Sequence, residues 1–334
     1  MKKYLFIIIV TALVLLFLTA CGTQTPGNNP NPPQDAPGDA PQDTPQDDAP
    51  DWEKVVIAMT INVMDPFVSL LVDGARDFAA KHPDIELIIV DANQDVSVQL
   101  RQAEDFANQR VDALIVKPVD PAATAAISDR FADENIPLLC VEQALHSDFH
   151  TFVGSDNVKG GTLQAEYVIE LLGGQGKVAI IVGNPRESGA IGRTEGVETT
   201  VLRFPDIEIV STQTANWSRD EAMRITEAWI QSGIEIDAIL SNNDEMALGA
   251  VMAFEQANRE LILIAGVDAL PEALQALKDG RMTATVFQNA YGMGYQVVES
   301  AYKIINGETV EHIIDIPFEL VTPALADEFL ARYE

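Results

Sequence analysis

Residues 55–90 read VVIAMTINVMDPFVSLLVDGARDFAAKHPDIELIIV and contain the repeating unit of the predicted fold. Residues 55–59 and 87–90 are short apolar runs rich in Val and Ile, which is typical of strands buried on both faces of a parallel sheet. The amphipathic stretch between them, residues 67–80, predicts a helix. A strand, a helix and a strand in this order form a βαβ unit.

The same alternation of apolar runs and amphipathic stretches continues along the chain. Further strands are predicted at residues 113–116, 138–141, 178–182, 207–211, 238–240, 261–265 and 284–287. Helices are predicted near residues 98–110, 122–134, 159–172, 190–203, 219–231, 245–256 and 271–278. The series restarts near Ser155-Asp156, so we expect two doubly wound α/β domains of similar size.

Polar and aromatic residues follow the predicted strands in both halves. Open α/β sheets bind ligands beyond the carboxyl ends of their strands, so two facing domains would form a cleft lined by these residues. They include Asn62, Asp65, Phe67, Lys117, Glu142, Gln143, Arg193, Trp217, Asn243, Asp244, Asp268 and Gln288. Amides and carboxylates pair with hydroxyl groups, and a flat indole covers the apolar face of a sugar ring. The set therefore suits a polyol.

The first 51 residues indicate export. Lys2 and Lys3 precede an apolar run over residues 5–18, which is shorter than the roughly 20 residues of a spanning helix. Leu18-Thr19-Ala20-Cys21 resembles the lipobox of bacterial lipoproteins, which implies cleavage before Cys21, lipidation of its thiol and an extracytoplasmic, membrane-anchored protein. Residues 22–52, rich in Pro, Gly, Gln and Asp, predict a disordered, extended tether.

Charge and cysteine content exclude several classes of protein. The formal net charge of -30 argues against binding to nucleic acid or flat binding to anionic lipid. The two cysteines are Cys21 and Cys140, so lipidation of the first leaves no disulfide. Cys140 lies in an apolar strand and is expected to be buried.

No motif for catalysis or for a cofactor is evident. The turn after the first strand, residues 61–66, lacks the glycines that a dinucleotide needs. The glycine-rich residues 173–176 precede a strand rather than follow one. His82, His146, His150 and His312 show no metal-ligand spacing. We therefore expect neither an enzyme nor a metal or cofactor site.

Five segments together carry a family resemblance. They are MDPFVSLLVDGARDFA (64–79), DALIVKPVDPAA (112–123), VGSDNVKGG (153–161), SNNDEMALGA (241–250) and AGVDALPEALQALKDGRMTATVFQ (265–288). They resemble the periplasmic sugar-binding proteins of ABC transporters, close to the ribose-binding type. The resemblance implies the type I fold, with three crossovers between a domain of residues 53–155 plus 289–317 and a domain of residues 156–288 plus 318–334. It also implies closure around a sugar or polyol, delivery to an ABC permease with its ATPase, and a monomer.

The resemblance also implies ligand-binding residues. Four polar residues match the family's ligand contacts directly: Arg193, Asn243, Asp268 and Gln288. Phe67 matches an aromatic that stacks on the sugar, and Trp217 stands where an aromatic is usual. Asp65 takes the place of an asparagine. Asp244, which follows Asn243 and opens a helix, is expected to be the N-cap of that helix.

Three positions depart from the ribose-binding pattern. Lys117, Glu142 and Gln143 stand where ribose binders have asparagine, aspartate and arginine, which argues against ribose itself as the ligand. Lys117 either pairs with Glu142, which suits a neutral ligand, or meets a ligand carboxylate directly.

Alternatives remain for residues and function. Phe67 could pack in the core, Trp217 could fill a groove, and Arg193 could pair with Glu142 between the domains. The ligand could be a sugar acid or a furanosyl compound. The same fold could also present its ligand to a chemoreceptor or a membrane kinase.

Overall fold

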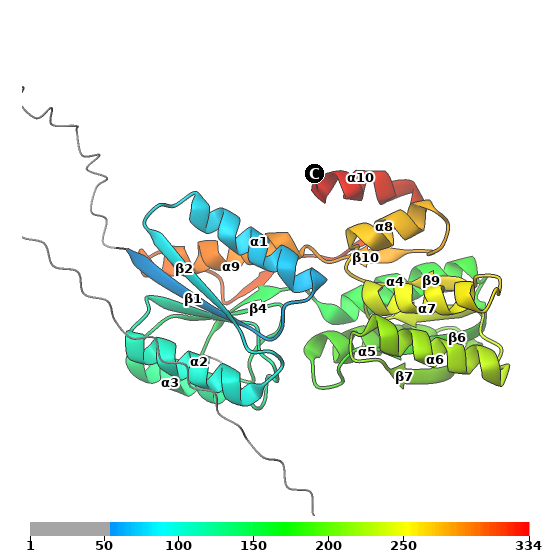
Figure 1. Ribbon diagram of the computed structural model, residues 1–334, viewed down its shortest axis with the longest axis horizontal. Helices are drawn as coiled ribbons and strands as arrows, with labels where there is room; N and C mark the ends of the chain where they lie inside the picture. Colours follow the sequence, from blue (N-terminus) through cyan, green and yellow to red (C-terminus); the bar gives the residue numbers. More distant parts are fainter. Residues whose placement is uncertain (1–53, 148, 334) are drawn as a thin grey trace, which may run out of the picture. The chain divides into compact units, whose positions relative to one another are not determined.

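The computed structural model describes residues 54–147 and 149–333 (Figure 1). The predicted signal, the predicted lipidation site Cys21 and the predicted tether over residues 22–52 lie outside the described residues. Among the residues that are described, no helix combines the length and the apolar character needed to cross a membrane.

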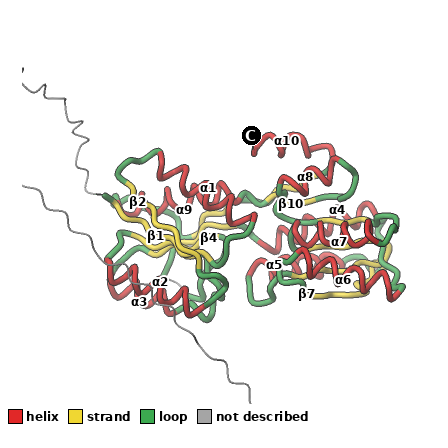
Figure 2. Tube along the Cα trace, in the orientation of Figure 1, coloured by secondary structure: helices red, strands yellow, loops and turns green. Residues whose placement is uncertain are grey.

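The first domain is built on a parallel six-stranded sheet in the order β11-β5-β4-β3-β1-β2. Its strands are β1 (Val55–Ile61), β2 (Ile85–Asp91), β3 (Ala113–Val116), β4 (Leu138–Val141), β5 (Thr151–Gly154) and β11 (Ile313–Asp315). Its helices are α1 (Pro66–Ala80), α2 (Val96–Gln109), α3 (Ala126–Glu134) and α9 (Ala290–Ile305). Helices α1 and α9 cover one face of the sheet, and α2 and α3 cover the other (Figure 2).

The second domain is built on a parallel four-stranded sheet in the order β7-β6-β8-β9. Its strands are β6 (Gln175–Val182), β7 (Asp206–Thr214), β8 (Ala238–Ser241) and β9 (Leu263–Ala265), beside an antiparallel pair of β10 (Thr285–Phe287) and β12 (Glu319–Val321). Its helices are α4 (Asn157–Leu171), α5 (Ser188–Val201), α6 (Arg219–Ser232), α7 (Asp244–Gln256), α8 (Pro271–Lys278) and α10 (Ala326–Leu330). Two 3-10 turns, Pro323–Leu325 and Ala331–Tyr333, flank α10.

Successive side chains along a strand point to opposite faces of its sheet, so each sheet has a hydrophobic core on both faces. In β1, Ile57 and Met59 pack beneath α1 and α9, whereas Ala58 packs in the cluster beneath α2 and α3. Burial of each large aliphatic side chain contributes roughly 1.5–3 kcal/mol. Cys140 is fully buried in β4, as expected, and its burial raises the pKa of the thiol to about 12.

The chain passes between the two sheets three times, after β5, after β10 and after β11. The two parallel-sheet α/β domains and their three crossovers confirm the predicted fold class. At the edge of the first sheet, the hydroxyl of Ser155 donates to the carbonyl of Ile316, so two of the crossing segments are hydrogen-bonded to each other.

Candidate ligand-binding site

A cavity lies at the carboxyl ends of strands from both domains, where the topology predicts a ligand site. It contains about 420 Å³ of space free of protein atoms. It is lined by Asn62, Asp65, Phe67, Gln94, Lys117, Glu142, Glu187, Arg193, Trp217, Asn243, Asp268 and Gln288. A larger groove of about 2270 Å³ lies around the amino ends of β6 and β8, the wrong end of the sheet for a ligand in this fold.

Nine of the ten residues predicted to bind ligand line this cavity, and Gln143 does not. Asn62, predicted only as one of the residues that follow strands, also lines it, as do Gln94 and Glu187, which were not predicted from the sequence. Asn62 and Gln94 follow β1 and β2, so their position after a strand was the available signal. Glu187 precedes α5 in a polar loop, and no sequence pattern separates it from surface acids.

Lys117 and Glu142 form a buried ion pair on the first domain's side of the cavity. The Lys117 Nζ lies 2.7 Å from Glu142 Oε2, and the two side chains are 5% and 9% exposed. Burial alone would lower the pKa of Lys117, but the carboxylates of Glu142, Glu187 and Asp65 outweigh it and raise that pKa. The structure thus contains the Lys117–Glu142 pair, the first of the two predicted alternatives.

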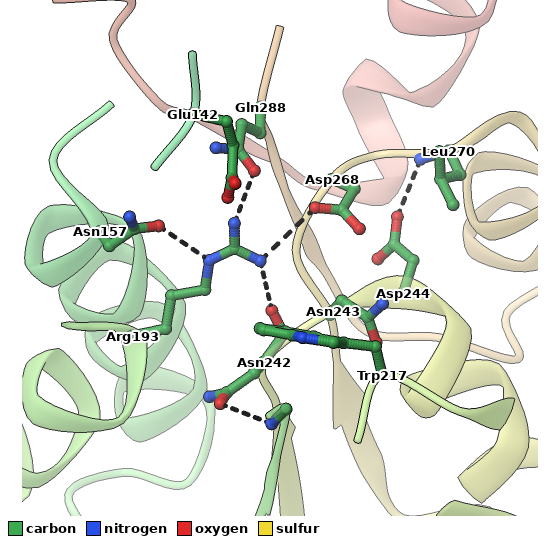
Figure 3. Close-up of polar contacts among 12 residues, drawn as sticks. Glu142, Asn157, Arg193, Trp217, Asn242, Asn243, Asp244, Asp268, Leu270 and Gln288 are labelled. Carbon is green, nitrogen blue, oxygen red and sulfur yellow. Dashed lines mark hydrogen bonds and ion pairs between the residues drawn. The ribbon is translucent and has the colours of Figure 1, made fainter. Parts of the chain in front are cut away.

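Arg193 is the centre of the hydrogen bonds on the opposite side (Figure 3). Its guanidinium donates to Asn157 Oδ1 at 3.1 Å, to the carbonyl of Asn242 at 2.7 Å and to Gln288 Oε1 at 2.5 Å. It also lies 3.5 Å from Asp268 Oδ1. Arg193 therefore pairs with Asp268, and the alternative pairing with Glu142 is wrong.

The backbone turns sharply where several lining residues leave their strands. Glu142, Trp217 and Asp268 have φ angles of 62°, 64° and 119°, in a region that residues other than glycine seldom adopt. Such strain is concentrated at functional sites, where the surrounding contacts hold it in place. Burial raises the pKa of Asp268 well above its ordinary value, against the opposing effect of Arg193.

The two aromatic residues of the cavity also belong to the domain cores. Phe67 packs against the core under α1, and Trp217 packs against both cores of the second domain. The indole of Trp217 donates to Glu187 Oε2 at 3.1 Å. A Cβ atom at Gly183 would lie 2.3 Å from this indole, so only glycine leaves room for it. Core packing and a surface for ligand are therefore compatible at both aromatic positions.

The helix after β8 corrects one prediction. Asn243, not Asp244, is the N-cap of α7, because its Oδ1 accepts from the backbone N–H of Met246 at 3.0 Å. Asp244 lies inside the first turn and is fully buried, where it accepts from the N–H of Leu270 and the hydroxyl of Thr285. Both residue types cap helices well, so the sequence could not place the first residue of α7.

Two buried polar atoms of the lining lack a hydrogen-bond partner among the described residues. They are Oδ1 of Asn62 and Nε2 of Gln288, whose residues are 3% and 1% exposed. Both residues line the cavity, and buried polar atoms are normally paired, so a ligand that reached these atoms would supply the missing donor and acceptor.

Carboxyl groups outnumber cations in the cavity lining. Asp65, Glu142, Glu187 and Asp268 face only Lys117 and Arg193 as charged partners of opposite sign. Burial raises the pKa of Asp65 and of Glu187. No group of His, Cys, Asp and Glu among the described residues could hold a metal ion.

In comparisons with known proteins, the family model and the relatives described below are all binding proteins. A family model described as a periplasmic binding protein domain matches residues 56–309. A putative rhizopine-binding protein of Rhizobium meliloti is 40% identical over 80% of this chain and 90% of its own length. The ribose import binding protein of Bacillus subtilis is 31% identical over 96% and 99%. The structure of an ABC transporter solute-binding protein from Bacillus halodurans with bound myo-inositol has a TM-score of 0.82 and 40% identity, over 85% and 99% of the two chains.

Proposed function

Because the chain belongs to the periplasmic binding protein family, a family of sugar binders and not of enzymes, we propose that it captures a neutral polyol or monosaccharide and delivers it to an ABC permease. The family implies a location outside the cytoplasm. Lipidation at Cys21 would hold the protein at the membrane, and the chain would act as a monomer.

The cavity lining is the observation that carries this proposal. A ring polyol offers hydroxyl groups around its edge and C–H groups on its faces. The unpaired Oδ1 of Asn62 and Nε2 of Gln288 would accept from and donate to such hydroxyls, and the carboxylates would accept hydrogen bonds from further hydroxyls. Phe67 and Trp217 would cover the apolar faces.

Charge favours a neutral ligand over a sugar acid. Lys117 and Arg193 are already engaged by Glu142 and Asp268. An added carboxylate would meet the remaining acidic groups in a site of low dielectric constant, where repulsion is strong. Because the relative that binds myo-inositol is 40% identical, we place cyclic polyols of the inositol type ahead of ribose.

Closure of the two domains would complete the site. We propose the domains as residues 53–155 plus 289–317 and residues 156–288 plus 318–334. Hinges would lie near Ser155-Asp156, Gln288-Asn289 and Pro317-Phe318, in the three crossing segments. The permease would then recognise the closed form, because a ligand favours only the state that it binds better.

A binding screen tests the proposed ligand class. The purified protein is heated with myo-inositol, D-ribose, D-glucose, xylitol or D-glucuronate, and the unfolding temperature is recorded. A ligand at 100 times its dissociation constant stabilises the folded state by about 2.7 kcal/mol. We expect the largest shift with myo-inositol and none with D-glucuronate. Preference for the acid, or no shift with any neutral compound, would contradict the proposal.

A further inference from the structure

Gln143, the predicted ligand residue that does not line the cavity, makes hydrogen bonds in two directions. It is fully buried and follows Glu142 directly. Its Nε2 donates to the carbonyl of Pro118 at 2.9 Å, and its Oε1 accepts from the backbone N–H of Ser188 at 2.7 Å. Pro118 follows β3 in the first domain, whereas Ser188 is the first residue of α5 in the second. One side-chain amide therefore bridges the two domains.

The bond to Ser188 gives a hydrogen-bond acceptor to a backbone N–H in the first turn of helix α5. The first N–H groups of any helix have no partner within the helix. Glu187 occupies the N-cap position of α5, but its side chain makes no capping hydrogen bond. It is directed instead to Asn184 and to the indole of Trp217. The oxygen of Gln143 thus acts as the missing cap, supplied by the opposite domain.

The same helix presents two cavity residues. Glu187 immediately precedes α5, and Arg193 lies in its second turn. Pro118, at the other end of the bridge, directly follows Lys117. Gln143 therefore connects the loop that carries Lys117 to the helix that carries Arg193, without lining the cavity itself.

We propose that Gln143 is a positioning residue that latches the two domains together by capping α5 from the first domain. The latch needs no ligand, because both of its partners are protein groups. It would raise the population of the closed state in the free protein and slow the release of bound ligand. The second effect rests on the proposed function, whereas the first does not.

The chain offers a matched control for Gln143. Gln99 in α2 is also a fully buried glutamine that bonds to the loop after β3, where it donates to the carbonyl of Lys117 at 3.0 Å and accepts from the N–H of Val119 at 2.8 Å. All of these partners belong to the first domain. Gln99→Met therefore removes the same kind of hydrogen bonds near the cavity, but no contact between domains.

The ligand-free test is amide hydrogen exchange measured by NMR on wild type, Gln143→Met and Gln99→Met. We expect the Ser188 amide to exchange faster in Gln143→Met, with exchange at Gly196 in the middle of α5 unchanged. Gln99→Met should leave Ser188 at the wild-type rate. Equal Ser188 rates in wild type and Gln143→Met would overturn the latch.

The ligand test is stopped-flow dissociation of myo-inositol, followed by Trp fluorescence. Loss of the hydrogen bonds from the Ser188 N–H and the longer one from its hydroxyl should release myo-inositol at least about five times faster in Gln143→Met, since one hydrogen bond alone corresponds to roughly a fivefold change in the closing equilibrium. An equal acceleration in Gln99→Met would overturn the proposal, because it would indicate a general loosening of the loop. Failure of wild type to bind myo-inositol would count against the proposed ligand alone. The exchange rate of the Ser188 amide would then show whether the latch exists.

Discussion

Single residues set the electrostatic character of the site, and the Lys117–Glu142 pair is buried within it. Breaking a buried ion pair by removing one partner leaves a charge without compensation, which typically costs 3–5 kcal/mol. Both side chains are almost fully buried, so solvent screening reduces this cost little. The pair should therefore control both ligand affinity and folding stability.

We predict that Lys117→Met weakens the binding of myo-inositol about 100-fold, because Glu142 loses the cation that orients it. Isothermal titration calorimetry with myo-inositol and D-glucuronate measures this change. The control is Lys117→Met with Glu142→Gln, which removes both charges and should recover most of the lost folding stability. If wild type prefers D-glucuronate and the single variant loses only that ligand, Lys117 binds a ligand carboxylate and our assignment is wrong.

At the scale of secondary-structure elements, Asp244 joins three parts of the second domain. It starts α7, accepts from Leu270 before α8, and accepts from Thr285 in β10. Burial is the main reason that its pKa is raised from 3.8 to about 7, against the opposing hydrogen bonds from Thr285 and Leu270. A carboxyl group with a raised pKa in the folded state stabilises the fold at low pH, and that contribution is lost as the pH rises through the folded pKa.

We therefore predict that wild-type stability decreases between pH 4 and about pH 7, and that Asp244→Asn reduces this slope. Urea unfolding at several pH values in this window measures the effect, which should amount to a few kcal/mol. Asp129→Asn, at an exposed position in α3, is the control and should keep the wild-type slope. A slope that is identical in wild type and Asp244→Asn would show that Asp244 is already ionised across this range.

The elements also show how far the sequence could predict the structure. Runs of Val and Ile located the buried strands, since a parallel sheet covered on both faces needs them. The three-residue strands β11 and β12 went unpredicted because IID and ELV are too short and too polar to stand out as apolar runs. Helix α2 begins two residues before its predicted start, because Asp95 caps it.

The binding site was predictable only in part. Residues placed directly after strands were found because topology alone brings them together. Glu187 was missed, and the bridging contacts of Gln143 were not predicted, because both depend on α5 meeting the opposite domain. Contacts between domains leave no periodic pattern in the sequence.

At the scale of the whole molecule, the site depends on both domains, because residues from each line one cavity. The bond from Arg193 to Gln288 also links the cavity to the second crossing segment. Binding at the cavity should therefore bias the relative position of the domains.

We predict that saturation with myo-inositol decreases the radius of gyration measured by small-angle X-ray scattering. The closed state brings polar groups of both domains onto the same ligand, so ligand raises its population. D-Glucuronate at the same concentration is the control and should leave the radius unchanged. An unaltered radius at saturating myo-inositol would rule out hinge closure as the binding mechanism.

The burial of Cys140 has a practical consequence for measurement. A sheltered thiol with a raised pKa reacts poorly with maleimides, because only the thiolate is a strong nucleophile. A cysteine introduced at Met64, which is 46% exposed and adjoins the cavity residue Asp65, would then be labelled selectively within the described residues. A dye attached there would sit beside the cavity and would report the proposed closure of the domains. The domain pair thus offers a scaffold for an optical sensor whose colour or brightness follows polyol concentration in real time.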